Sequence, residues 1–136
     1  MNLLMCPVCR EALTLNERTW RCANSHSYDV AKQGYVNLHV VQHKHSKNPG
    51  DTRESVQARR AFLSAGHYAP LQQAVVNKVR DLRIENLLDI GCGEGYYTDA
   101  MQTEVLQCVG VDIAKNAVQV AAKINKNITW VVGTGA

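Results

Sequence analysis

The chain lacks any long hydrophobic run and any targeting segment. No stretch reaches the ~18 consecutive apolar residues that a membrane-spanning helix needs. Its first residues, MNLLMCPVC, contain neither the basic start nor the apolar run of a secretory signal peptide. These absences predict a soluble, cytoplasmic protein without a membrane partner. Reducing conditions there disfavour a disulfide framework, so clustered cysteines among the five would indicate a metal site.

Acidic residues are scarce in the first part of the chain. Residues 1–80 carry 11 Lys+Arg against 5 Asp+Glu, a net +6, whereas residues 81–136 carry 4 against 7, a net −3. All five histidines also lie in the first part. A basic part of this kind is a candidate surface for a polyanion, although an ordinary solvated face explains the charge equally well.

The length and the patterning divide the 136 residues into three zones. Residues 1–41 contain clustered cysteines and short strand-like pieces, and they are too few to fold on apolar burial alone. Residues 42–85 read as a polar, basic linker followed by two helices. Residues 86–136 alternate strand, glycine-rich turn, helix, strand, helix and strand, which predicts βαβ units with a parallel sheet.

The two helices of the middle zone have recognisable starts and apolar positions. Asp51 with Glu54 resembles a capping box at the start of the first helix, which is expected to end near Gly66. Pro70 marks the start of the second. The expected apolar positions are Ala58, Phe62 and Ala65 on the first helix, and Leu71, Ala74, Val75, Val79 and Leu82 on the second.

Four residues of the first zone have the spacing of a metal site. In CPVCREALTLNERTWRCANSH the ligand types follow the pattern C-x2-C-x12-C-x3-H. The predicted ligands are Cys6, Cys9, Cys22 and His26. Two close pairs separated by a hairpin-length insert can face one tetrahedral Zn²⁺, and four protein ligands leave no open position for a substrate. The sequence therefore predicts a structural zinc ribbon.

Three other interpretations of this region remain open. The cysteines could be unliganded thiols, or C-x-x-C could be a redox pair, although that motif normally opens a helix of a thioredoxin-like unit. His39, His43 and His45 could compete as the fourth ligand, but they lie in or beside the basic linker, where a surface role is expected.

The stretch LLDIGCGEGYYTDA predicts a cofactor-binding turn between a strand and a helix. A dinucleotide fingerprint needs a small residue where Tyr96 stands, which disfavours NAD, and no G-K-[ST] follows for a phosphate loop. The pattern D-x-G-x-G-x-G instead resembles motif I of the Rossmann-like S-adenosylmethionine-dependent methyltransferases. It comprises Asp89, Gly91, Gly93 and Gly95. Tyr96 and Tyr97 read as packing residues, with a place beside the cofactor as the alternative.

Asp112 ends the next strand, 21 positions after Gly91. An acidic residue at about 20 positions from the glycine turn accepts the ribose hydroxyls of the cofactor in related folds. The alternative is a cap for the helix that begins near Lys115, and the two roles are compatible. The spacing thus favours Asp112 as a cofactor residue.

Several motifs in this order resemble one family across the whole chain. The zinc spacing is followed by YDVAKQGYVNL, NPGD, QARRAFLSAGHYAPL and then motif I. This order resembles the RlmA family, bacterial 23S rRNA (guanine-N1)-methyltransferases. The resemblance implies an α/β fold: an N-terminal zinc ribbon that helps to hold rRNA, then a Rossmann-like catalytic domain, with a homodimer often formed by the full-length enzyme.

The resemblance also implies what the rest of the site contains. The family carries further strands after the third one, so we expect this chain to be the front part of a longer enzyme, with the unknown catalytic residues in the part that is missing. The expected rRNA phosphate contacts are Lys44, Lys47, Arg53, Arg59 and Arg60. The competing functions are a non-catalytic zinc-ribbon nucleic-acid binder and a small-molecule methyltransferase.

Overall fold

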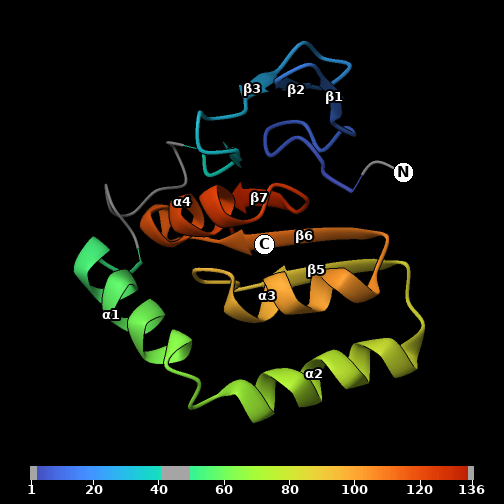
Figure 1. The fold of residues 1–136 in the computed structure, drawn as a ribbon. Coiled ribbons are helices and arrows are strands. Elements are labelled where there is room, and N and C mark those ends of the chain that lie inside the picture. Colours follow the sequence, from blue (N-terminus) through green and yellow to red (C-terminus); the bar gives the residue numbers. More distant parts are fainter. Residues whose placement is uncertain (1–2, 41–49, 135–136) are drawn as a thin grey trace.

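The fold consists of two sheets and four α-helices in the residues that the computed structural model describes, 3–40 and 50–134 (Figure 1). The first part contains β1 (Thr14–Asn16), β2 (Thr19–Arg21), β3 (Ser27–Asp29) and β4 (Tyr35–Asn37). The helices α1 (Arg53–Ser64) and α2 (Ala69–Leu82) follow. The last part contains β5 (Asn86–Ile90), α3 (Tyr96–Met101), the 3₁₀ turn η2 (Gln102–Glu104), β6 (Gln107–Asp112), α4 (Lys115–Ile124) and β7 (Thr129–Val132).

The first sheet is a small antiparallel meander of β1, β2 and β3. A turn at Glu17 and Arg18 joins β1 to β2, with Glu17 in the left-handed region at φ 58°. Trp20 lies opposite Leu15 on one side and opposite Tyr28 on the other. The sheet and its cysteine-bearing turns form the ribbon module, residues 3–30.

The second sheet is parallel, in the order β4-β7-β6-β5. The three strands of the last zone pair in parallel, which confirms the predicted βαβ organisation. The sequence did not predict the fourth strand: β4 lies in the cysteine-containing zone, yet it pairs with β7, as in Tyr35 with Trp130. Residues 38–40 of the strand-like piece YVNLHVV are outside any strand.

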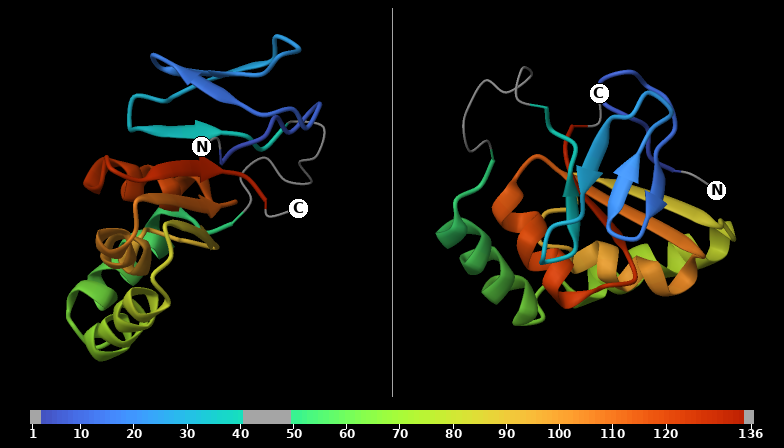
Figure 2. Two further views of the ribbon diagram at one scale, coloured as in Figure 1. Left: turned by 90° about the vertical axis from the view of Figure 1, so that its right-hand side faces the viewer. Right: turned by 90° about the horizontal axis from the view of Figure 1, so that it is seen from above.

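The two faces of the parallel sheet pack against different partners. On one face Trp130, 1% exposed, lies in a core with Val118 and Ala121 of α4. On the other face Val109 and its neighbours contact side chains of the ribbon module. The ribbon residues in that contact include Leu4, Trp20 and Tyr28. The ribbon and α2 therefore lie at opposite ends of the molecule, with the sheet between them (Figures 1 and 2).

The strand β5 forms one edge of this sheet. Leu88 and Ile90 are in register with Val109 and Val111, so they share the face that the ribbon covers elsewhere. They are nevertheless 58% and 59% exposed, because the ribbon packs over the strands farther from this edge.

The helices α1 and α2 differ in detail from the expected pattern. The cap of α1 is Thr52, whose hydroxyl accepts from Ser55 N at 3.1 Å, and not Asp51. The buried residue of α1 is Val56, which packs on Ala114 and Ala117, whereas Phe62 is 47% exposed. The expected stop is confirmed, since Gly66 follows the helix with φ 92°.

On α2 the buried residues are Val76 and Val79, while Leu71 and Leu82 are largely exposed. Helical spacing predicted more buried residues than the structure has, because α2 packs mainly against α3 and η2. Among the residues described, no helix is long and apolar enough to cross a bilayer.

Candidate metal centre and cofactor site

The four predicted metal ligands come together in the ribbon module. Cys6 and Cys9 lie on the first turn, and Cys22 and His26 flank the turn between β2 and β3. Their ligand atoms all lie within 4.8 Å of one another. The Sγ atoms of Cys9 and Cys22 are 3.6 Å apart, and Nδ1 of His26 lies 3.3 Å from Cys22 Sγ.

These separations fit a tetrahedral zinc ion. Zn–S bonds near 2.3 Å place two sulfur ligands ~3.7 Å apart. Among the described residues, the group that could hold a metal ion consists of Cys6, Cys9, Cys22 and His26. His39 is outside this group, and His43 and His45 lie outside the residues that the structure describes.

Tyr28 links the metal centre to the parallel sheet. Its hydroxyl lies 3.3 Å from Cys6 Sγ, and its ring packs with the buried valines of the sheet. Burial raises the pKa of Tyr28, with the contact to Cys6 as the next cause, so the phenol keeps its proton. A neutral phenol can donate to a thiolate ligand and thereby orient it.

The glycine motif forms a loop between β5 and α3. Gly91, Gly93 and Gly95 all have positive φ values, 81°, 59° and 90°, which only glycine adopts without strain. A Cβ on Gly91 or Gly93 would meet no atom within 4 Å, so this side of the loop is open to a ligand. A Cβ on Gly95 would lie 2.9 Å from the ring of Trp130, so this glycine is needed for packing.

Asp112 lies directly against this loop. Its Oδ2 accepts a hydrogen bond from the N–H of Gly93 at 2.9 Å, and its Oδ1 accepts from Ala114 N at 2.8 Å. The fold thus brings together two motifs 19 residues apart in the chain. The bond from Ala114 N corresponds to the helix-capping role considered as the alternative for Asp112. The residue at the cap position of α4, however, is Ala114. Each carboxylate oxygen retains a further lone pair for a ligand hydroxyl.

Asp89, the first residue of the glycine motif, is bonded to α3. Its Oδ2 accepts from the hydroxyl of Thr98, a fully buried residue of α3, at 2.7 Å. This bond ties β5 to α3, so the observed contact of Asp89 is structural support for the loop.

The five expected RNA contacts do not form one described surface. Lys44 and Lys47 lie outside the described residues. Arg53, Arg59 and Arg60 are on α1. Arg59 pairs with Asp51 at 2.6 Å, and Arg60 lies 3.7 Å from Glu94. Both guanidinium groups are therefore partly neutralised.

Sequence reasoning missed Glu94, the residue between the second and third glycines of the motif. It is 6% exposed, and burial raises its pKa despite the attraction of the Tyr96 N–H and of Arg60. The sequence did contain a signal for it, because a charged residue stands between two glycines of the motif. Tyr96 and Tyr97 contact each other edge to face, with ring centroids 5.0 Å apart.

Comparison with known proteins identifies both parts of the chain. Residues 4–47 match the family described as "RlmA, N-terminal", a zinc ribbon, and residues 87–136 match "Methyltransferase domain". A solved structure from Methanococcus maripaludis, titled as an S-adenosyl-L-methionine-dependent methyltransferase by provisional assignment, has a TM-score of 0.51. At 19% identity over 66% of this chain and 46% of that one, it supports the fold alone. The first part of the chain is therefore similar to the zinc ribbon of RlmA, and the last part is similar to a methyltransferase domain.

Relatives that match nearly the whole chain specify the resemblance further. The chain is 38% identical, over 90% of its length, to the 23S rRNA (guanine(748)-N(1))-methyltransferase of Streptomyces fradiae. It is 35% identical, over 88%, to a protein of Micromonospora griseorubida provisionally named 23S rRNA (guanine-N(1)-)-methyltransferase. These matches cover 45% and 47% of those proteins, so the chain spans about half the length of the relatives. The resemblance to RlmA indicated by the motifs is confirmed.

Proposed function

We propose that this chain is the N-terminal part of an S-adenosylmethionine-dependent methyltransferase that modifies N1 of a guanine in 23S rRNA. The observation that carries the proposal is the contact between Asp112 and the N–H of Gly93, at the open side of the glycine loop. The names of the relatives support rRNA over a small molecule as the substrate. An rRNA substrate in turn supports a cytoplasmic location.

Within this proposal the cofactor residues have separate tasks. Asp112 accepts the ribose hydroxyls, and the open sides of Gly91 and Gly93 let the backbone approach the cofactor closely. Gly95 and Asp89 support the loop: Gly95 lets the start of α3 pack against Trp130, and Asp89 bonds β5 to α3. S-adenosylmethionine supplies an electrophilic methyl group, so the contribution of the protein is orientation. The described residues provide no assigned base for guanine N1.

The proposed division of the chain follows from these tasks. Residues 1–41 form the zinc-ribbon RNA-recognition module, residues 42–85 the basic linker with two helices, and residues 86–136 the start of the methyltransferase domain. The pairing of β4 with β7 means that the first unit also contributes a strand to the last. The rRNA contacts proposed for Lys44, Lys47, Arg53, Arg59 and Arg60 rest on charge. A homodimer is proposed only for the full-length enzyme.

The cofactor assignment is tested by calorimetric titration of the zinc-loaded chain with S-adenosylmethionine. We expect Asp112→Ala to weaken binding at least tenfold, which corresponds to about 1.4 kcal/mol. Asp81→Ala, an exposed acid on α2, is the matched control and should bind like the unsubstituted chain. Equal affinities for all three proteins would exclude Asp112 from the cofactor site.

The reaction is tested by transfer of labelled methyl to unmodified 23S rRNA. We expect no turnover by the 136-residue chain and turnover by a chimera that adds the C-terminal half of the Streptomyces fradiae relative. Correct orientation of two reactants can lower the activation barrier by about 7–11 kcal/mol. We expect this orientation to need the C-terminal half as well as the part of the cofactor site in this chain. Turnover at comparable rates by both proteins would show that the part beyond Ala136 is dispensable.

A further inference from the structure

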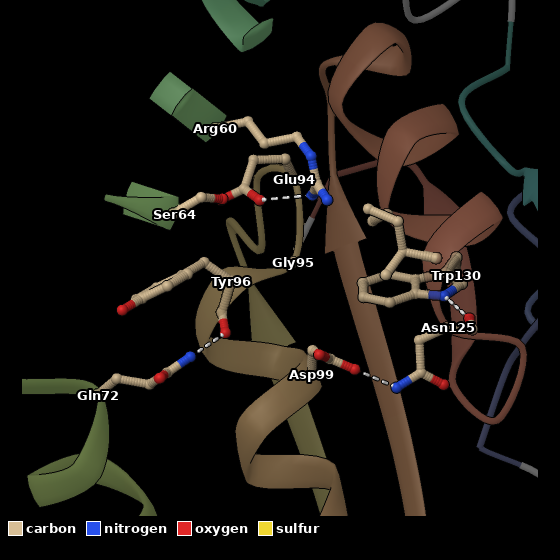
Figure 3. Close-up of a pocket in the computed structure, with 11 residues that line it drawn as sticks. Arg60, Ser64, Gln72, Glu94, Gly95, Tyr96, Asp99, Asn125 and Trp130 are labelled. Carbon is tan, nitrogen blue, oxygen red and sulfur yellow. Dashed lines mark hydrogen bonds and ion pairs between the residues drawn. The ribbon is translucent and has the colours of Figure 1, made fainter. Parts of the chain in front are cut away.

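The first residue of α3 is contacted from two sides, by Gln72 of α2 and by Glu94, which is paired with Arg60 of α1. Gln72 of α2 donates from Nε2 to the carbonyl oxygen of Tyr96 at 2.7 Å. The N–H of Tyr96 interacts with the carboxylate of Glu94, which in turn lies 3.7 Å from Nη1 of Arg60 on α1. Figure 3 shows Arg60, Glu94, Tyr96 and Gln72 around one cavity. Tyr96 directly follows Gly95, so these contacts act at the end of the glycine loop.

A cavity lies beside these residues, between the glycine loop and the helices around it. It has a volume of about 210 Å³ and is lined by residues of α1, α2, α3 and α4. α1 contacts the rest of the chain mainly at its other end, where Val56 packs on Ala114 and Ala117. The contact of Arg60 with Glu94 therefore reaches across to the glycine loop from the part of α1 that borders the cavity, whereas Gln72 bonds to Tyr96 where α2 packs against α3.

The charge of Glu94 is not explained by stability. Its side chain is 5% exposed, and the nearest guanidinium belongs to Arg60, itself 37% exposed, at 3.7 Å. Removing a carboxylate from water costs more than such a long ion pair returns, and burial accordingly raises the pKa of Glu94. Groups retained at a cost in stability cluster at functional sites.

We infer that Glu94 and Gln72 are positioning residues that fasten the glycine loop to the α1–α2 pair, with Arg60 as the anchor of Glu94. The inference rests on the proposed function, since it assigns these residues to the orientation of the cofactor-binding loop. They act through the backbone of Tyr96 and touch no reacting atom. The α1–α2 pair is then part of the cofactor site, although it precedes β5 and the glycine loop in the chain.

The test compares Glu94→Gln with Glu104→Gln in the zinc-loaded chain. Glu104 is also ion-paired, with Arg80 at 2.8 Å, but it lies away from the loop. We expect Glu94→Gln to speed amide hydrogen exchange over residues 93–98 and to weaken S-adenosylmethionine binding about fivefold or more, the range of typical coupling between sites. The thermal midpoint should stay level or rise. Glu104→Gln should leave exchange and affinity unchanged.

Second variants keep the test decisive if Glu94→Gln does not fold. Arg60→Gln should reproduce its effects, Arg60→Lys should restore much of the affinity, and combining Arg60→Gln with Glu94→Gln should add little. Gln72→Ala should loosen the same amides, whereas Gln73→Ala on the adjacent position should not, because Gln73 bonds to Asn77 instead.

Two results separate this inference from the proposed function. Unchanged exchange over residues 93–98 in Glu94→Gln, Arg60→Gln and Gln72→Ala would overturn the inference, whatever the cofactor affinity. Absence of S-adenosylmethionine binding by the unsubstituted chain would overturn the cofactor assignment, and faster exchange in the three variants would still establish that these residues hold the loop.

Discussion

The ribbon module and the parallel sheet are stabilised by different means. The buried cluster of the ribbon consists of Cys6, Leu13 and Cys22, and two of these three belong to the group that could hold a metal ion. The parallel sheet has a buried cluster of nine residues around Trp130 on one face and four valines on the other. A module with one non-ligand core residue depends on its metal, whereas the sheet depends on close packing.

The comparison also shows that neither part is independent of the other. Trp20 and Tyr28 of the ribbon cover Val109 and Val111, and β4 completes the sheet at β7. Loss of the metal should therefore also loosen the face of the sheet that the ribbon module covers. The predictions below separate the metal-dependent part from the packing-dependent part.

Removal of zinc should have the largest effect. The ligands bind the metal as deprotonated groups, and structural zinc sites contribute about 10–16 kcal/mol in small peptides. We expect one Zn²⁺ per chain by elemental analysis, and we expect chelation to abolish exchange protection over residues 4–30 while residues 86–132 stay protected, with increased exchange at Val109 and Val111. A zinc-free protein with an intact ribbon would contradict the metal assignment.

Gly110→Ala should destabilise the sheet without affecting the zinc centre. A Cβ at this position would lie 2.6 Å from the ring of Trp130, which is 1% exposed and has little room to move. We expect a loss of about 1–3 kcal/mol in the free energy of unfolding, measured by denaturant titration. Gly133→Ala is the matched control, because a Cβ there would be no closer than 3.7 Å to its nearest neighbour. Equal losses in the two variants would contradict the packing argument.

Salt dependence of RNA binding should distinguish the arginines of α1. Neutralised phosphates release counterions, so replacing both Arg59 and Arg60 with Ala should flatten the slope of log affinity against log salt by roughly one to two units for an rRNA hairpin. Because each is already paired with an acid, we expect the lower end of that range. Fluorescence anisotropy at several salt concentrations measures it. An unchanged slope would indicate that neither arginine contacts RNA phosphate and that both belong to an ordinary solvated face.

The pH dependence of stability should show the smallest effect, with opposite signs for two glutamates. Burial raises the pKa of Glu94 in the folded protein above 4.5. The free energy of unfolding of the unsubstituted chain should therefore fall, relative to that of Glu94→Gln, as the pH rises from below 4.5 through the raised pKa. The hydrogen bond from Arg80 lowers the pKa of Glu104, so its stabilising contribution is present above 4.5 and is lost as pH falls through the lowered pKa. Comparing each variant with the unsubstituted chain by urea titration at a series of pH values from below the lowered pKa of Glu104 up to neutral pH measures the difference. The same sign for both would refute the burial argument for Glu94.

Much of the site could be predicted from the sequence because its residues are adjacent in the chain or have a fixed spacing. The zinc ligands form two close pairs, and the glycine loop needs residues that tolerate positive φ. Helix faces were predicted less well: Phe62 has helical spacing but is exposed, while Val56 is buried against Ala114. Spacing shows which residues share a face, but the width of the contact depends on what packs there.

The sequence by itself determined the Cys3His group that could hold a metal, the turn of the glycine loop and the parallel pairing of the last three strands. Each of these follows from local chemistry or from the alternation of strands and helices along the chain. Only the tertiary structure decided that β4 joins β7 and that Asp112 receives the N–H of Gly93. It alone placed Glu94 and Gln72 around Tyr96. These contacts join segments far apart in the chain, and their partners are selected by burial and shape, which no local pattern records.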